Sequence, residues 1–203
     1  MPLAQSGVQR RELESSEARR RVLDAAVDAF AERGFGGTST RDVAVRAGRS
    51  PAAVYVHYDS KEALLYAISL EGHMAALDCL KLAYASSEDP AARLHAMVFA
   101  FSDWHMENAR LARVVQYELH ALSKVHRADI VSLRRRFHRV MVGAVRDGIR
   151  AGQFQVDDVN GTARALLSLC IDLVRWFDPA RGRNSRAIAQ LNADLALRMV
   201  GDV

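Results

Sequence analysis

The sequence is short of several features that would mark other classes of protein. Its 203 residues include only 2 cysteines and 4 prolines, and it has no uninterrupted apolar run of about 18 residues. Cys79 and Cys170 lie far apart in apolar helical patterns, so we expect buried free thiols rather than a disulfide or a metal site. The N-terminus lacks the apolar core of a signal peptide. We therefore expect a cytoplasmic protein with no membrane partner.

The motifs of common catalytic sites are also missing. There is no Gly-rich phosphate loop, no His-Glu-x-x-His motif, and no Ser or Cys in a nucleophile elbow. None of the 7 histidines is spaced four residues from another, as a metal-binding pair on one helix face would be. We expect no catalytic residue, no metal and no cofactor. A helical-bundle enzyme is kept only as an alternative.

What the sequence does contain is apolar residues and positive charge. Half of it is hydrophobic, which is ample for a sizeable core. The formal net charge is +4 and the pI is about 9.4. These values agree with a polyanionic partner, but many proteins that bind no nucleic acid are equally basic.

The stretch between residues 38 and 55 predicts two short helices joined by a tight turn. Ser39 and Asp42 have the spacing of a capping box, which begins the first helix. Gly48 can adopt the left-handed conformation that ends it. Ser50 then caps the second helix, with a proline at its first position. Two short helices so closely spaced are typical of a helix-turn-helix, whose second helix enters the major groove of DNA.

The rest of the chain shows helical periodicity and no strand pattern. Residues 1–15 are polar and read as a loose arm, either disordered or touching DNA. A helix from about residue 16 to residue 33 has one apolar face, and Asp59 with Glu62 forms a capping pair for a helix that leaves the helix-turn-helix. Further helices are expected at about 61–85, 90–107, 108–122, 126–151, 157–177 and 185–200. The fold class is therefore all-α.

A longer motif contains the helix-turn-helix. It runs through LDAA at 23–26, FAERGF at 30–35, TRDVA at 40–44, AG at 47–48 and VYxHYxSKEALL at 54–65. Over about residues 20–66 the sequence resembles the DNA-binding domain of the TetR family of bacterial transcriptional regulators. Two residues depart from the family pattern. Arg49 stands where an aliphatic residue is usual, and Tyr58 where Phe is commoner.

The resemblance implies a domain organisation and a function. Residues 1–15 would be a flexible N-terminal arm, 16–62 a three-helix DNA-binding domain, and 63–203 a larger helical domain for ligand binding and dimerisation. The helices at 157–177 and 185–200 would pair with their copies in a homodimer, unless their apolar stripes only fill the core of one subunit. We expect a repressor on a pseudo-palindromic operator of double-stranded DNA, released by a small amphipathic or apolar effector. The alternative is a dimeric DNA-binding protein that responds to no ligand.

The resemblance also assigns candidate contacts with DNA. The guanidinium of Arg41 can form two hydrogen bonds to guanine, and apolar side chains at the tip of the second helix suit thymine methyl groups. Tyr55 and His57 resemble a pair that clamps the DNA backbone, although Tyr55 could instead be a core aromatic residue. Lys61 matches a phosphate anchor. The full set of predicted DNA-binding residues is Thr40, Arg41, Ser50, Pro51, Ala52, Ala53, Tyr55, His57 and Lys61.

The effector is expected among the aromatic and methionine side chains of the larger domain. Residues 172–179 resemble the end of a helix in TetR-like regulators that sense acyl-coenzyme A, although Trp176 and Arg175 could instead belong to a dimer seam. Four arginines within residues 134–139 are either solvated or near an anionic ligand head. We expect a fatty acyl-coenzyme A or a similar amphipathic anion. The predicted ligand-binding residues are Phe101, Trp104, Tyr117, Phe137, Met141 and Arg175.

Overall fold

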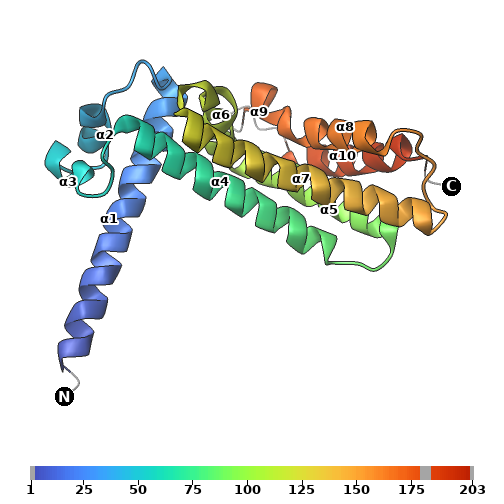
Figure 1. Ribbon diagram of the computed structural model, residues 1–203, viewed down its shortest axis with the longest axis horizontal. Coiled ribbons are helices and arrows are strands. Elements are labelled where there is room, and N and C mark those ends of the chain that lie inside the picture. Colours follow the sequence, from blue (N-terminus) through green and yellow to red (C-terminus); the bar gives the residue numbers. More distant parts are fainter. Residues whose placement is uncertain (1–2, 179–183, 202–203) are drawn as a thin grey trace.

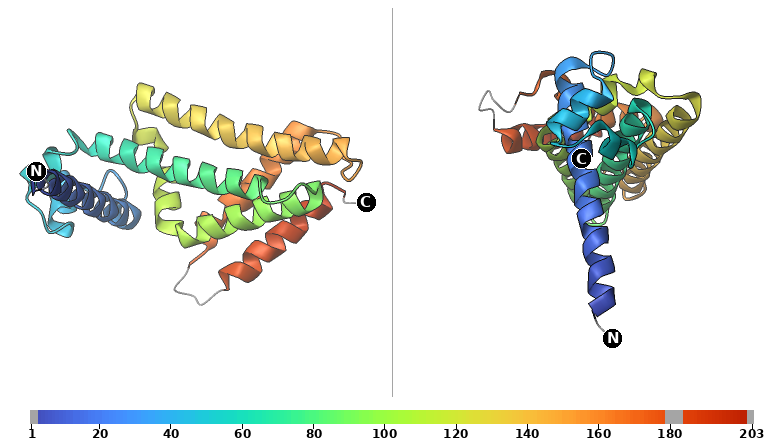
Figure 2. Two further views of the ribbon diagram at one scale, coloured as in Figure 1. Left: turned by 90° about the horizontal axis from the view of Figure 1, so that it is seen from below. Right: turned by 90° about the vertical axis from the view of Figure 1, so that its left-hand side faces the viewer.

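The computed structural model describes residues 3–178 and 184–201, with side chains from residue 15 onward. Over these residues it contains helices and no strand (Figure 1). The all-α prediction is confirmed. The molecule is elongated, with the N-terminal helices at one end and the C-terminus near the other (Figures 1 and 2).

The N-terminal end contains three helices. α1 (Leu3–Arg33), α2 (Thr40–Arg46) and α3 (Pro51–Tyr55) precede the long α4 (Lys61–Tyr84), which continues into the body (Figure 1). Since α1 begins at Leu3, the expectation of a loose arm over residues 1–15 is wrong for the backbone from that residue on. Most of that stretch consists of arginine, glutamate, glutamine and leucine, which favour helix, and Gly7 alone does not interrupt it.

The sequence signals around α2 and α3 act as predicted. Ser39 Oγ accepts a hydrogen bond of 3.1 Å from the backbone N–H of Asp42, and Asp42 Oδ2 accepts one of 2.8 Å from the N–H of Ser39. Ser50 caps α3 through the N–H of Ala53. Gly48 has a φ of +63°, the left-handed conformation that ends α2. The two short helices are thus fixed by local chemistry.

At the start of α4 the predicted capping pair is wrong. The N-cap is Ser60, whose Oγ accepts from the N–H of Ala63 at 3.0 Å. Glu62 instead accepts hydrogen bonds of 2.8 Å from the N–H of Ser123 and from Nδ1 of His126. Because Ser60 already fills the capping position, the carboxylate of Glu62 is left to bind the start of a later helix of the body, which begins at Lys124.

The body is built around α5. It consists of α5 (Pro90–Glu107), α6 (Ala109–Tyr117), the 3₁₀ helix η1 (Leu119–Ala121), α7 (Lys124–Arg150), α8 (Val159–Ile171), α9 (Leu173–Trp176) and α10 (Ser185–Met199). α5 packs against α4, α7, α8 and α10, while α6 crosses one end and contacts α1 and α4. Figure 2 shows α4, α5 and α7 running side by side.

Two of the predicted helices are interrupted. The helix expected over 108–122 ends at Tyr117 and is followed by η1, and the helix expected over 157–177 is broken at Asp172 between α8 and α9. Asn108 occupies the N-cap position of α6, but its side chain makes no capping hydrogen bond there and donates instead to the carbonyl of Trp104 at 2.9 Å. α9, which follows the second interruption, is in contact with α5.

One described helix, α4, is long and apolar enough by length and composition to cross a membrane. The core helix of a water-soluble protein can satisfy the same criteria, and half of the apolar window is buried inside the structure. Its buried residues include Leu64, Leu65, Leu77 and Leu80. The contacts of α4 with α5, α6 and α7 therefore account for its apolar composition.

The core continues from the N-terminal helices into the body without a break. One cluster of buried side chains includes Phe30 of α1, Val54 of α3, Leu77 of α4 and Phe101 of α5. Both cysteines are free, with Cys170 buried and Cys79 partly buried. Burial raises the pKa of Cys170 to about 12, so this thiol is an apolar core group.

A close approach in α7 gives a first prediction. A Cβ added to Gly148 would lie 1.9 Å from Cδ2 of the buried Phe154, whereas one added to Gly143 would meet nothing within 4 Å. We expect Gly148→Ala to lower the free energy of unfolding by about 1–3 kcal/mol through overpacking. The matched control Gly143→Ala should raise it by up to about 1 kcal/mol. Urea unfolding of both variants would test this, and equal stability would contradict the contact.

Candidate functional site: a DNA-binding end and a cavity in the body

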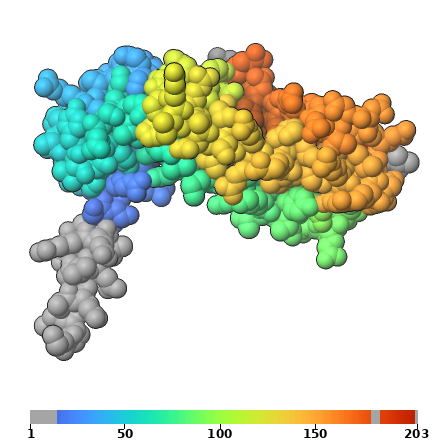
Figure 3. Space-filling view, in the orientation of Figure 1, coloured from blue at the N-terminus to red at the C-terminus, as the bar shows by residue number. Residues whose placement is uncertain are grey.

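The N-terminal helices form a lobe at one end of the molecule, continuous with the body (Figure 3). On α3, Pro51 and Ala52 are exposed, Ala53 is half-buried, and Val54 is buried against the core. A short helix is unstable alone, but this one is held by its cap and by the packing of Val54. Its outer face is left for contact with another molecule.

The predicted DNA-binding residues differ in the exposure of their side chains and in the hydrogen bonds that these side chains make within the protein. Arg41 is exposed and makes none of the hydrogen bonds or ion pairs found within the described chain. Tyr55 is 50 % exposed, so it is not a core aromatic residue, and its hydroxyl lies 3.0 Å from Oγ1 of Thr40. The hydroxyl of Ser50 accepts the capping hydrogen bond of α3. His57 is half-buried beside them.

Lys61 is held inside the lobe. Its Nζ donates to the carbonyl oxygens of Phe35 at 2.7 Å and Thr38 at 2.9 Å, and it lies 4.1 Å from the centre of the Phe35 ring. These contacts join the start of α4 to the loop between α1 and α2. Two of the three ammonium donors are used in this way. No local pattern in the sequence predicts this internal role of Lys61.

A second set of contacts joins α1 to α4 and to the segment just before α4. Nε of Arg19 donates to the hydroxyl of Tyr58 at 2.9 Å, and its Nη2 donates to Glu71 on α4 at 2.8 Å. Tyr58, unlike Tyr55, is buried. The hydroxyl of Tyr58 therefore accepts a hydrogen bond from Arg19. A phenylalanine at this position would leave Nε of Arg19 without this acceptor.

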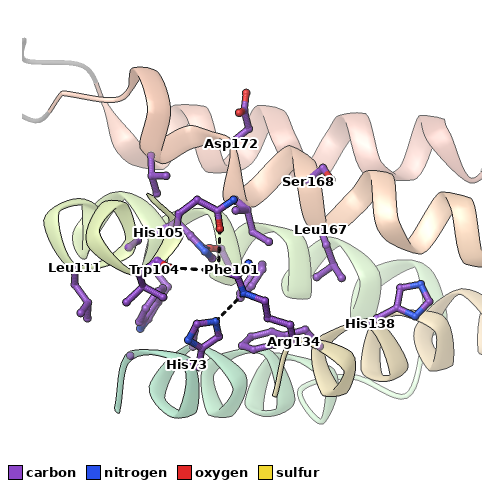
Figure 4. A pocket seen from close by; sticks show the side chains of 18 of the residues that line it. His73, Phe101, Trp104, His105, Leu111, Arg134, His138, Leu167, Ser168 and Asp172 are labelled. Carbon is purple, nitrogen blue, oxygen red and sulfur yellow. Dashed lines mark hydrogen bonds between the residues drawn. The ribbon is translucent and has the colours of Figure 1, made fainter. Parts of the chain in front are cut away.

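The body contains a cavity of about 740 Å³, between α4, α5, α6, α7 and α8. That volume is in the range of small-molecule sites. Apolar side chains form much of its wall, and four arginines also line it. Figure 4 shows side chains from several helices pointing toward the same space. The larger apolar side chains are Phe101, Trp104, Leu111, Val115, Tyr117, Val131, Phe137, Leu167, Ile171 and Val174, and the arginines are Arg134, Arg135, Arg139 and Arg164.

Four of the six predicted ligand-binding residues line this cavity, namely Phe101, Trp104, Tyr117 and Phe137. The other two do not. Met141 is fully buried in the core one turn beyond Phe137. Arg175 is exposed, and its Nη2 pairs with Asp172 Oδ2 at 3.1 Å. Arg175 lies on α9, after the interruption of the helix at Asp172, and is not among the residues that line the cavity.

Two buried histidines in the cavity wall had no functional signal in the sequence. Nδ1 of His73 donates to the carbonyl of Ser69, and Nδ1 of His105 donates to that of Phe101, both at 2.7 Å. Burial lowers the pKa of each histidine from 6.5 to about 4. Both rings are therefore neutral at pH 7.

α6 connects the cavity to the N-terminal lobe. It supplies several cavity residues, among them Leu111 and Val115. It also contacts α1, and Nη1 of Arg110 donates to Asp28 Oδ1 at 2.9 Å. A movement of α6 at the cavity would therefore displace the residues through which α6 contacts α1.

A helix-turn-helix lobe joined to a helical body with its own cavity defines the class of helix-turn-helix regulators. The comparisons with known proteins identify the family. Residues 22–68 match the family model of bacterial regulatory proteins of the tetR family, and residues 87–200 match that of the tetracyclin repressor-like C-terminal domain. The chain belongs to the TetR family of transcriptional regulators, which bind DNA and are not enzymes.

The relatives include repressors and solved regulators. The chain is 33 % identical to the HTH-type transcriptional repressor KstR2 of Rhodococcus jostii, covering 81 % of each chain. It is 42 % identical to a solved tetR-family regulatory protein from Rhodococcus RHA1, with a TM-score of 0.87, covering 92 % of this chain and 98 % of the other. A structure of AibR with isovaleryl coenzyme A and operator DNA shares the fold, with a TM-score of 0.81 and 20 % identity, over 92 % of this chain and 100 % of that one.

Proposed function

We propose that this chain is a homodimeric repressor that binds a pseudo-palindromic operator and leaves it when an amphipathic anion, such as an acyl-coenzyme A thioester, enters the cavity. The observation that carries the proposal is the cavity itself. Apolar walls formed by residues such as Phe101 and Leu167 suit an acyl chain, and arginines suit an anionic head.

The outer face of α10 supports the homodimer. Leu191 is 55 % exposed, and Ile188 and Leu195 on the same stripe are only partly buried. On α8, by contrast, the apolar residues Leu166 and Cys170 are fully buried within the subunit. An exposed apolar stripe suits a second copy of the chain. Two copies related by a two-fold axis could place both α3 helices in successive major grooves, about 34–36 Å apart.

The ligand class is supported by charge. Among the described residues that line the cavity, Asp172 is the only carboxylate, and it is paired with Arg175. The wall therefore carries an excess of positive charge that suits a phosphate-bearing molecule better than a cationic drug. The AibR complex shows that this fold can hold a coenzyme A thioester. AibR is 20 % identical to this chain, so the likeness between the two proteins is one of fold alone.

Release from DNA is supported by the position of α6 between the cavity and α1. A ligand that moves α6 or α4 would change the separation of the two α3 helices in the dimer. A typical coupling free energy of about 1–3 kcal/mol would weaken operator binding about 5- to 150-fold. Reciprocity then requires operator DNA to weaken ligand binding by the same factor.

The experiment begins with a footprint on DNA upstream of the gene itself to obtain an operator fragment. Fluorescence anisotropy then measures operator affinity with octanoyl-coenzyme A, with free coenzyme A as the control. We expect the thioester to release the DNA, and calorimetry to show weaker thioester binding when operator is present. Equal thioester affinity with and without operator would contradict the inducer role and favour a DNA-binding protein that responds to no ligand. Release only by cationic aromatic compounds would contradict the ligand class.

A further inference from the structure

Arg134 reaches from α7 into the wall of the cavity (Figure 4). Its Nε donates to Nε2 of His73 at 3.1 Å, and its Nη2 donates to the carbonyl of Val115 at 3.3 Å and to Oε1 of Gln116 at 3.2 Å. Since Nδ1 of His73 donates to Ser69, the ring is the tautomer whose Nε2 accepts. Arg134 is thus oriented by three neutral acceptors on two other helices.

No carboxylate compensates this guanidinium within the described part of the chain. Other arginines are paired with an acid, as Arg93 is with Asp147 at 2.7 Å, but Arg134 has no such partner. Burial lowers the pKa of Arg134, and no acidic neighbour opposes that effect. Asp172, the acid in the cavity wall, lies across the cavity from His73 (Figure 4). A partly buried cation without a counterion is costly, and a bound anion would offset that cost.

Arg134 differs from the other cavity arginines in depth. Arg135, Arg139 and Arg164 are exposed, whereas Arg134 is half-buried and rests against the buried ring of His73. An anionic head at the rim would meet the three exposed arginines. Nη1 of Arg134 makes no hydrogen bond within the described chain and remains available to a group further inside.

We propose that Arg134 binds a carboxylate on the part of the effector that enters the cavity, so that the effector carries a second anionic group besides its head. This inference rests on the proposed function in taking the cavity as the effector site. It adds a preference for an acyl group that carries its own carboxylate, which an ordinary fatty acyl chain lacks. Arg134 would then select among acyl groups, and His73 would act as a positioning residue that orients it.

The test compares ligands that differ in one carboxylate. Calorimetry with the full-length protein would measure hexanedioyl-coenzyme A against hexanoyl-coenzyme A, which have the same chain length. We expect the wild type to bind the dicarboxylic thioester at least about tenfold more tightly, as one charge-assisted hydrogen bond allows. Arg134→Met should reduce this ratio to about one. The control Arg135→Met, at the exposed rim, should weaken both thioesters alike and leave the ratio unchanged.

Several outcomes would overturn the inference. One is equal wild-type affinity for the two thioesters. Another is an unchanged affinity ratio in Arg134→Met, with both ligands weakened equally, as a purely structural contact would give. Should Arg134→Met fail to fold, Arg134→Lys and the wild-type ratio still decide the question. Free decanedioate and decanoate form a second pair without coenzyme A. A preference for decanedioate that depends on Arg134, with no binding of either thioester, would refute the coenzyme A proposal and leave this inference standing.

Discussion

We expect the free energy of unfolding to fall as the pH is lowered from about 6.5 to 4, because of His73 and His105. Each has a pKa of about 4 in the folded protein and 6.5 in the unfolded chain. Between these values the unfolded chain binds more protons, so stability is fully present above pH 6.5 and is lost as the pH falls. Each histidine should contribute about 3 kcal/mol to this loss.

The measurement is urea unfolding of the wild type and of His105→Asn at pH 7, 5.5 and 4.5. Asparagine retains an amide donor for the carbonyl of Phe101 but does not titrate. The variant should therefore lose about 2–3 kcal/mol less than the wild type between pH 7 and 4.5. His120→Asn, at an exposed position, is the control and should follow the wild type. A variant curve parallel to the wild type would show that His105 is not held neutral by burial.

The second large effect is a difference between substitutions of Lys61 and of Arg41 in protein stability and in DNA affinity. Lys61→Met removes two hydrogen bonds from the ammonium to the carbonyls of Phe35 and Thr38. We expect it to lower the free energy of unfolding by about 1.5–3 kcal/mol and to weaken binding to every DNA sequence. Arg41→Ala should leave stability within about 0.5 kcal/mol. It should weaken operator binding by about 1–3 kcal/mol and relax the preference at one position in each half-site.

Unfolding without DNA and anisotropy with operator and shuffled DNA would measure these effects. Lys81→Met is the matched control for the lysine, because Lys81 is exposed on the same helix and its Nζ is 3.7 Å from Asp78. It should change stability by no more than about 0.5 kcal/mol. Unchanged stability in Lys61→Met would refute its internal role. Equal loss of operator and shuffled binding in Arg41→Ala would refute base reading.

Local signals alone were enough to predict the two short helices, α2 and α3. Ser39, Asp42, Gly48 and Ser50 act through hydrogen bonds or backbone conformations within a few residues, so their effect can be read from spacing. The helix starting at Pro90 follows from the same kind of signal. By contrast, the role of Glu62 was mispredicted, because its partners, Ser123 and His126, lie about sixty residues away.

The sequence by itself determined the helical class, the helix-turn-helix and the family, since each depends on periodicity, caps and a motif of consecutive residues. Only the tertiary structure decided which side chains face the cavity. Periodicity placed Phe101, Phe137 and Met141 on apolar faces, but not which of them borders empty space and which packs in the core. It also could not show that Arg134 meets His73 and Gln116, or that Arg175 pairs with Asp172 and does not line the cavity. Those positions depend on how α4, α6, α7 and α8 pack together, and a helix pattern carries no information about its partner.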